Sequence, residues 1–325
     1  MSVRPLTSIV IPCFNQARFL SDAIESARAQ ADASIEIIVV NDGSTDATSR
    51  VARRYPDVRL IEQRNQGLSA ARNAGLAVAQ GTYVVCLDAD DRLLPGAVDV
   101  GVAHASGDPR VAIVAGRCRV IAEDGTALPS PAAPSSIGDD PYRALLAANF
   151  IWTPGAALCR RHDVVVAGGF DPAVSAAADY GLYLRLARTR RIVCHDTAVV
   201  EYRQHSANMS RDPVLMLETT LRVLDAERPH VPRELKAALA HGRRTWRAFY
   251  GDQMVQELRL ALRRNPRPAA IAALAWRLLR YDPRGAARHV GRAVARIARG
   301  IPRGMVEDGR FHDTAASGRP GNSGR

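Results

Sequence analysis

The sequence lacks the features that define several large classes of protein. Its five cysteines are scattered without Cys-x-x-Cys spacing, which argues against a zinc site or a disulfide framework and indicates reduced, buried thiols in a cytosolic protein. No stretch approaches the roughly 18–20 consecutive apolar residues that span a bilayer, and the first residues show no cleavage-site pattern of a signal peptide. We therefore expect a protein that is soluble or attached peripherally to a membrane.

Glycine-rich nucleotide-binding turns are also missing. The apolar residues 8–12 are typical of a first strand, but they lead into Cys13-Phe14-Asn15-Gln16 and not into Gly-x-Gly-x-x-Gly. This disfavours the dinucleotide site of a dehydrogenase. A nucleotidyltransferase, which shares the same class of sheet, would normally carry a glycine-rich loop with arginine or lysine at this point, and that loop is absent as well.

Charge is unevenly distributed along the 325 residues. The net charge is +11, yet residues 1–210 hold 21 basic and 22 acidic groups, whereas residues 211–325 hold 23 basic and 11 acidic groups. We expect residues 1–210 to form the catalytic domain and residues 211–305 to form a basic helical extension. Residues 306–325 are rich in Gly, Ser, Asp and Arg, which predicts a disordered tail.

Strand-like and helix-like segments alternate in the first part of the chain. Apolar runs typical of buried strands occupy residues 8–12, 35–40, 58–62 and 82–87. This order, with helical patterns between the runs, predicts an α/β fold with a mostly parallel sheet covered by helices. Ligands of such sheets bind beyond the carboxyl ends of the strands. Because Asp42 and Asp88 each follow a strand, we expect both to face one crevice.

The run that ends at residue 87 stops in three carboxylates, Asp88, Asp90 and Asp91, within four residues. Carboxylates this close repel one another unless a cation lies between them. Hard oxygen ligands suit Mg²⁺ or Mn²⁺, which also bind the phosphates of a substrate. The alternative interpretation is an acidic turn in which Asp91 caps the helix that follows.

Four motifs occur in order at residues 8–15, 38–46, 67–75 and 87–91. They read Ser-Ile-Val-Ile-Pro-Cys-Phe-Asn, Ile-Val-Val-Asn-Asp-Gly-Ser-Thr-Asp, Gly-Leu-Ser-Ala-Ala-Arg-Asn-Ala-Gly and Leu-Asp-Ala-Asp-Asp. Together they resemble glycosyltransferase family 2, and the resemblance extends from residue 6 to about residue 210. It implies the Rossmann-like GT-A fold and a metal-dependent, inverting enzyme of the hexosyltransferase type. Such an enzyme moves a sugar from a nucleotide-sugar, usually a UDP-sugar, to a hydroxyl acceptor.

The resemblance also implies a role for each matching residue. Pro12 and Asn15 would lie against the nucleotide, and Asp42 would hydrogen-bond its base. Arg72 would contact the nucleotide or its diphosphate. Position 41 holds Asn where many relatives have Asp, and Asn can still donate and accept hydrogen bonds there. Outside the motif, Asp42 would be interpreted as a turn residue and Arg72 as half of a surface ion pair.

The same resemblance predicts the metal and diphosphate ligands. Asp88 would meet the ribose or the metal, and Asp90, with Asp91 as a further candidate, would bind the metal. Residues 201–210 resemble the family's Tyr-Arg-x-His-x-x-Asn-x-Ser ending, in which His205 would reach the diphosphate or complete the metal shell. Arg203 also suits a diphosphate through its planar fork.

The acceptor side is predicted less sharply. Residues 178–186 resemble the family's Glu-Asp segment, with Ala178 in the usual Glu position and Asp179 as the candidate general base. Asp179 could instead be a first-turn helix carboxylate. The Ala at position 178 and the Asn at position 41 leave open a catalytically silent GT-A module that binds a nucleotide-sugar or scaffolds an assembly. Trp152 either stacks on a sugar ring or packs against the apolar run beside it.

Arginines recur every four residues near the end of the chain, at Arg284, Arg288, Arg292 and Arg296. This stripe, beside apolar residues, predicts an interfacial helix attracted to anionic lipids. It would place the protein on the inner face of the plasma membrane and fits a glycan or lipid-linked acceptor of cell-envelope synthesis. The alternative is a solvated helix packed on the catalytic domain. Nucleic acid is disfavoured as a partner, because no nucleic-acid motif accompanies the basic region and its aromatic residues are not interleaved for stacking.

Overall fold

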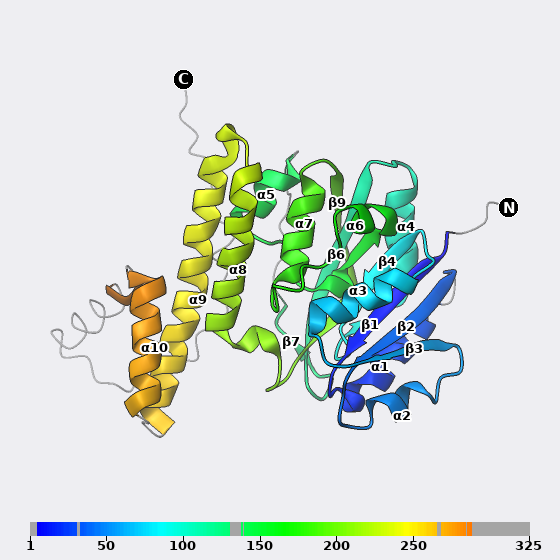
Figure 1. Ribbon diagram of the computed structural model, residues 1–325, viewed down its shortest axis with the longest axis horizontal. Coiled ribbons are helices and arrows are strands. Elements are labelled where there is room, and N and C mark those ends of the chain that lie inside the picture. Colours follow the sequence, from blue (N-terminus) through cyan, green and yellow to red (C-terminus); the bar gives the residue numbers. More distant parts are fainter. Residues whose placement is uncertain are drawn as a thin grey trace.

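The computed structural model describes residues 5–30, 33–130, 138, 140–264, 268–283 and 285–287. A nine-stranded sheet with helices on its faces forms one part of the molecule, and a layer of long helices stands beside it (Figure 1). The strand order is β3-β2-β1-β4-β8-β6-β9-β5, with β7 paired to β6.

The first half of the sheet is parallel, as the sequence predicted. Its strands are β1 (Thr7–Cys13), β2 (Ile35–Asp42), β3 (Val58–Gln63) and β4 (Tyr83–Cys86). The helices between them are α1 (Ala17–Arg28), α2 (Thr48–Ala52) and α3 (Leu68–Val78). The central strands β1 and β2 are buried on both faces, which explains their continuous apolar sequences. Their parallel register brings the carboxyl ends of β1, β2 and β4 to one edge.

The second half of the sheet is mixed. Its strands are β5 (Arg92–Leu93), β6 (Val111–Ala122), β7 (Ala127–Leu128), β8 (Ala157–Arg160) and β9 (Arg191–Gln204). β8 runs antiparallel to both β4 and β6, whereas β6 and β9 are parallel with register shifts near Arg117. The predicted mostly parallel sheet therefore holds for β1–β4, and antiparallel pairing begins at β8. The helices of this half are α4 (Ala97–Ser106), α5 (Pro141–Ala147), α6 (Arg161–Val166) and α7 (Ala178–Ala187).

Three longer helices follow the sheet: α8 (Pro213–Glu227), α9 (Lys236–Arg264) and α10 (Pro268–Tyr281). Asp212 caps α8 by accepting from the N–H groups of Val214 and Leu215, with proline at the first helical position. Residues of α8 and of the start of α9 join the main hydrophobic core, among them Leu224 and Leu239. The expected boundary at residue 210 therefore separates two sequence segments that share one core. A second cluster joins α8, α9 and α10.

Glu227 fastens the helical layer to the sheet-bearing part. It is buried and accepts a hydrogen bond from the Tyr142 hydroxyl at 2.6 Å. Its two carboxylate oxygens also accept from Nε and Nη2 of Arg188, each at 2.7 Å. This bidentate, charge-assisted contact links α8 to α5 and to the end of α7.

Several other predictions can be compared with the structure. All five cysteines are free; four are buried as predicted, and Cys194 is exposed. The four arginines of the predicted basic stripe and the predicted tail at 306–325 lie outside the described residues. Among the helices that the structure describes, none combines the length and apolar character needed to cross a bilayer.

Gly75 on α3 lies against the central strands, and its replacement tests this packing. A Cβ atom there would clash with Cγ1 of Val10 and lie 3.2 Å from Cγ2 of Val40. We expect Gly75→Ala to lower the free energy of unfolding by about 1–3 kcal/mol, although alanine favours a helix. Gly107→Ala is the control, at an exposed helix end with no atom within 4 Å of the added Cβ, and should be neutral or slightly stabilising. Equal urea midpoints for the two variants would contradict the packing.

Candidate active site

The acidic loop after β4 lies at the edge where the parallel strands end. Leu87 is fully buried and donates its N–H to the carbonyl of Val10 on β1, which fixes where the loop leaves the sheet. Asp42 is the last residue of β2, the other neighbour of β1. Asp42 and the acidic loop therefore lie at the same edge of the sheet, while the expectation that Asp42 and Asp88 face one crevice stays a prediction.

Arg72 of α3 is a buried cation that connects two predicted site residues. Its Nη2 donates to Oδ1 of Asp88 at 2.7 Å, while its Nε has no hydrogen-bond partner and the side chain is only 4 % exposed. Burial alone would lower the pKa of Arg72, but the charges of Asp88 and Asp179 raise it above its usual value, so the guanidinium stays charged. It also lies 5.3 Å from the centre of the Phe170 ring.

Asp179 is placed in the first turn of α7, where the helix dipole favours a carboxylate. Burial raises the pKa of Asp179, and the nearby charge of Arg72 works in the opposite direction. A carboxylate whose pKa is raised in this way is a better proton acceptor than one in water. The buried Ala178 beside it supplies no second carboxylate.

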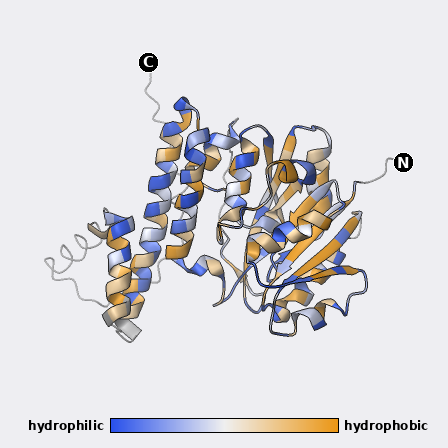
Figure 2. Cartoon of the chain, in the orientation of Figure 1, coloured by the Kyte–Doolittle hydropathy of each residue, from blue (hydrophilic) through white to orange (hydrophobic). Residues whose placement is uncertain are grey.

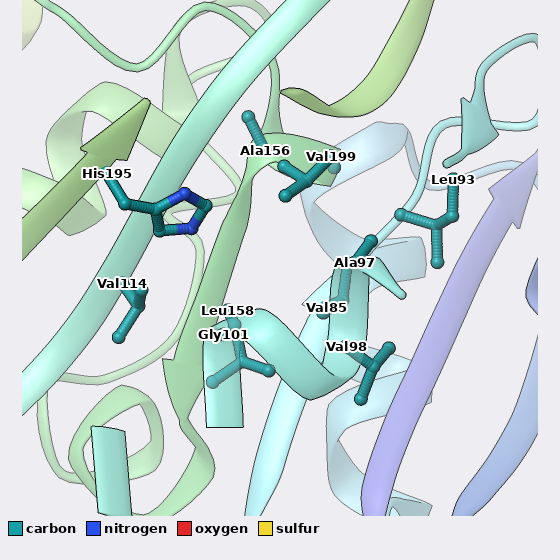
Figure 3. Close-up of a pocket in the computed structure, with 11 residues that line it drawn as sticks. Val85, Leu93, Ala97, Val98, Gly101, Val114, Ala156, Leu158, His195 and Val199 are labelled. Carbon is teal, nitrogen blue, oxygen red and sulfur yellow. The ribbon is translucent and has the colours of Figure 1, made fainter. Parts of the chain in front are cut away.

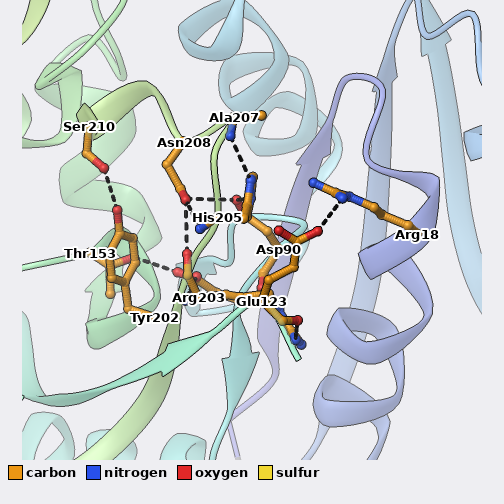
Figure 4. Close-up of polar contacts among 11 residues, drawn as sticks. Arg18, Asp90, Glu123, Thr153, Tyr202, Arg203, His205, Ala207, Asn208 and Ser210 are labelled. Atoms are coloured by element: carbon orange, nitrogen blue, oxygen red, sulfur yellow. Dashed lines mark hydrogen bonds and ion pairs between the residues drawn. The ribbon is translucent and has the colours of Figure 1, made fainter. Parts of the chain in front are cut away.

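Asp90 is held by the segment that follows β9 (Figure 4). Nε2 of His205 lies 2.8 Å from Oδ2 of Asp90, and Nδ2 of Asn208 lies 3.3 Å from the same oxygen. The N–H of Ala207 donates to Nδ1 of His205 at 3.2 Å, which leaves Nε2 to carry the proton of the neutral ring. His205 also packs against Phe19, with ring centres 4.9 Å apart. Residues 90 and 205, which are far apart in sequence, are thus brought together.

The donor types at this position fit a divalent cation. Burial and the charge of Asp88 raise the pKa of Asp90, and a bound cation would relieve that repulsion. Within the described ranges, no group of three or more His, Cys, Asp or Glu side chains is arranged to hold a metal. A cation at Asp90 would therefore need ligands from water and from a substrate's phosphates, which is the usual coordination of Mg²⁺.

Asp91 differs from its neighbours and corrects the predicted three-carboxylate metal set. It is 0 % exposed; its Oδ1 accepts from the N–H of Arg203 at 3.0 Å, and its Oδ2 accepts from Oγ1 of Thr153 at 2.9 Å. Both oxygens are thus bound by the protein interior, and Asp91 shapes the loop instead of offering a metal ligand. The alternative of a helix cap is wrong too, because the N-cap of α4 is Gly96.

Arg203 is held by protein oxygens in the described structure, which disfavours the predicted contact with a diphosphate. Its Nε donates to the carbonyl of Asp90 at 2.9 Å, its Nη1 to the carbonyl of Glu123 at 2.8 Å, and its Nη2 to Oδ2 of Asp22 at 2.7 Å. The side chain is 3 % exposed and lies over Phe19. Since these three nitrogens are bound to protein oxygens, Arg203 ties α1 and the β6–β7 turn to the acidic loop.

The predicted base-binding residues organise the loops at the ends of β1 and β2. Asp42 is buried and accepts from Nε2 of Gln63 at 2.7 Å, from N–H of Gln66 at 2.9 Å and from N–H of Gly67 at 2.8 Å. It therefore fixes the entry to α3. Asn41 binds Oγ of Ser49 and the N–H of Ser44 through its two amide ends. The role of Asp42 toward a base remains a prediction.

Asn15 adopts φ 54° and accepts from the N–H of Thr45 at 2.8 Å, while its own N–H donates to Oγ of Ser44. It thereby joins the loops after β1 and β2. Pro12 is buried within β1. Phe14 lies between these two residues in the sequence, and its ring is exposed. It was not singled out from the sequence, although an aromatic residue directly after a buried strand could have marked it as a candidate site residue.

Trp152 is exposed, so the interpretation that it packs against its apolar neighbours is wrong. The residue is 55 % exposed, whereas its neighbours Ile151 and Thr153 are buried. Thr153 is the residue that binds Asp91. The indole of Trp152 is therefore exposed to solvent next to Thr153, the residue that is hydrogen-bonded to the acidic loop.

A small cavity elsewhere has a different character (Figure 3). It lies between α4 and the strands, and apart from His195 its lining is apolar. Nδ1 of His195 has no hydrogen-bond partner in the described structure. An apolar cavity of this kind does not suit a charged group such as a diphosphate, whereas the acidic loop could bind one through a divalent cation.

The fold and this sheet edge define the GT-A class of glycosyltransferases. Residues 8–164 match the family model described as Glycosyl transferase family 2, which identifies this part of the chain as a family 2 glycosyltransferase domain. Two solved structures share the fold. The mannosyltransferase PcManGT from Pyrobaculum calidifontis, in complex with GDP-Man and Mn²⁺, has a TM-score of 0.60 and 21 % identity, covering 91 % of this chain and 88 % of that one. S. aureus TarS 1–349, in complex with UDP-GlcNAc, has a TM-score of 0.61 and 15 % identity, covering 97 % and 98 %.

Sequence relatives point to the same family. A chondroitin synthase from Escherichia coli is 29 % identical over 199 residues, which is 56 % of this chain and 26 % of the relative. The matches to the curated relatives span about a quarter of their length.

The structural role of Asp91 can be tested through its partner. Thr153→Val keeps the shape of the side chain but leaves Oδ2 of Asp91 buried without a donor. We expect the free energy of unfolding to fall by about 1–3 kcal/mol. Thr82→Val, at an exposed position, is the control and should change it by less than about 0.5 kcal/mol. Indistinguishable denaturation curves for the two variants would show that Asp91 does not depend on Thr153.

Proposed function

We propose that this protein transfers a sugar from a nucleotide-sugar, with a UDP-sugar as the first candidate, to a hydroxyl acceptor with inversion at the anomeric carbon. The observation that supports it most is the ion pair between Asp88 and Arg72 at the sheet edge. Arg72 is also close enough to Asp179 for their charges to interact. Asp90 and His205 stand at the same loop. These contacts support a site in which one end binds the donor and Asp179 is the candidate base.

The proposed chemistry assigns separate tasks to these residues. Asp179 accepts the proton of the acceptor hydroxyl as that oxygen bonds to the anomeric carbon and the bond to the diphosphate breaks. Arg72 keeps Asp88 in place and offsets negative charge at the donor. Mg²⁺ or Mn²⁺ held by Asp90 and Asp88, beside His205, would stabilise the charge of the leaving diphosphate.

Donor binding can be measured by thermal stabilisation. We expect one class among UDP-, GDP- and dTDP-sugars to stabilise the protein in the presence of Mn²⁺, by about 2.7 kcal/mol at 100 times the dissociation constant. Asp90→Asn should lose the metal-dependent part. Asp57→Asn, an exposed carboxylate that precedes β3 and so lies at the other edge of the sheet, is the control. If no donor stabilises the protein, the result would contradict the proposed enzyme and favour the interpretation as a scaffold.

The base is tested by Asp179→Asn and by the pH profile. The variant should retain donor-dependent stabilisation and lose about 10²–10⁴-fold in turnover. A base works only when it is deprotonated, and the pKa of Asp179 is raised above 3.8 by burial. The acid limb of kcat/KM should therefore lie at higher pH than for an ordinary aspartate and disappear in the variant. Unchanged turnover in Asp179→Asn would exclude it as the base, and absence of turnover in the wild type with every donor would favour a silent module.

We also propose that Trp152 stacks on a sugar ring of a glycan or lipid-linked acceptor. Trp152→Ala should raise the KM for acceptor by roughly tenfold, the equivalent of about 1.4 kcal/mol, and leave hydrolysis of the donor by water unchanged. Trp152→Phe should restore most of the affinity, because an aromatic face remains. A loss of donor hydrolysis in Trp152→Ala would instead place the indole at the donor.

The membrane placement is a further part of the proposal. We propose a peripheral protein on the inner face of the plasma membrane, acting in the synthesis of a cell-envelope polysaccharide or glycolipid. The support is the basic excess of residues 211–325, which hold 23 basic and 11 acidic groups.

A further inference from the structure

Helix α10 has two apolar faces, and only one of them is covered by described residues. Leu274, Leu278 and Tyr281 recur at helical spacing and join the cluster that α10 forms with α8 and α9. Trp276 and Leu279 lie on another side and are 58 % and 60 % exposed. A helix that only packed on its neighbours would carry polar residues there.

Two arginines border the exposed apolar pair. Arg277 and Arg280 are exposed and form no ion pair with any residue that the structure describes. The guanidinium of Arg280 lies 5.2 Å from the centre of the Trp276 ring. No acidic residue occurs anywhere in residues 268–281. We call Trp276, Arg277, Leu279 and Arg280 the outer face of α10.

This composition fits an anionic lipid surface. Tryptophan is favoured at the level of the lipid headgroups, leucine inserts at the acyl boundary, and arginine binds headgroup phosphates. Arg280 can keep its contact with Trp276 while its charge stays among the headgroups, as long basic side chains do at interfaces.

Charge disfavours the other candidates for covering this face. In a two-fold contact between copies, the same patch meets itself, so Arg277 and Arg280 would face their own copies without a carboxylate from α10. Residues 288–325 of the chain itself hold 8 basic and 3 acidic groups, so like charges oppose their docking as well.

We propose that the outer face of α10 is the surface through which the protein docks on anionic lipid. This inference rests on the membrane placement proposed above and names the residues that make the contact. Figure 1 places α10 on the far side of the helical layer from strands β1–β3, and Figure 2 shows apolar residues along α10 next to the more polar α9. Docking there leaves the acidic loop free to receive donor and acceptor.

The test is sedimentation of the full chain with vesicles of phosphatidylcholine alone and with vesicles enriched in phosphatidylglycerol. We expect binding only to the second kind, weakened by salt. Trp276→Ser with Leu279→Ser, and separately Arg277→Gln with Arg280→Gln, should each weaken binding at least tenfold. The control is Val165→Ser with Val166→Ser, which removes two exposed apolar side chains from α6 on the sheet-bearing part and should bind like the wild type.

Since the four side chains are exposed, the variants should keep the wild-type melting temperature, which is measured alongside. Equal binding of the wild type and both α10 variants would overturn the proposal, as would equal losses in the control. A wild-type dimer that the Trp276 and Leu279 substitutions dissociate, without any vesicle binding, would assign the face to a second copy and also overturn it. Donor-dependent stabilisation is read in the same proteins, so failure of the lipid surface and failure of sugar transfer are distinguishable.

Discussion

The position of the acidic loop depends on the burial of Asp91 against the backbone of Arg203. Asp91 accepts that N–H, and the guanidinium of Arg203 returns to the carbonyl of Asp90, one residue earlier. The same guanidinium reaches Asp22 on α1 and the carbonyl of Glu123. Buried charged groups are stable only when their hydrogen bonds are satisfied, so this network fixes the loop. The side chains of Asp88 and Asp90 take no part in it and contact Arg72 and His205 instead.

A second buried charge gives the site its chemistry. Arg72 pairs with Asp88 and interacts electrostatically with Asp179, the candidate base. A guanidinium cannot be deprotonated in a protein, so it supplies a fixed positive charge whatever the state of the two carboxylates. Donor binding and proton transfer would thus act in one electrostatic field, although α3 and α7 are far apart in sequence.

The sequence predicted the four parallel strands β1–β4 and placed Asp42 and Asp88 at strand ends. It also singled out Asp90 and His205, which the structure brings into contact, while their roles stay a prediction. It could not separate Asp91 from Asp90, because that difference depends on Thr153, a partner 62 residues away. The structural contacts of Arg203 could not be predicted for the same reason, since its partners lie on three distant segments. β9 was missed because charged residues interrupt its apolar pattern, and the exposure of Trp152 depends on which neighbours the fold buries.

The most direct test of the central claim is a crystal structure with a UDP-sugar and Mn²⁺, in which anomalous scattering locates the metal. The account predicts a manganese peak at Asp90 that bridges to the diphosphate, with Asp88 beside it and Asp91 still bound to Thr153 and the N–H of Arg203. A manganese ion bound by Asp91, or a nucleotide bound away from the carboxyl edge of β1, β2 and β4, would contradict it.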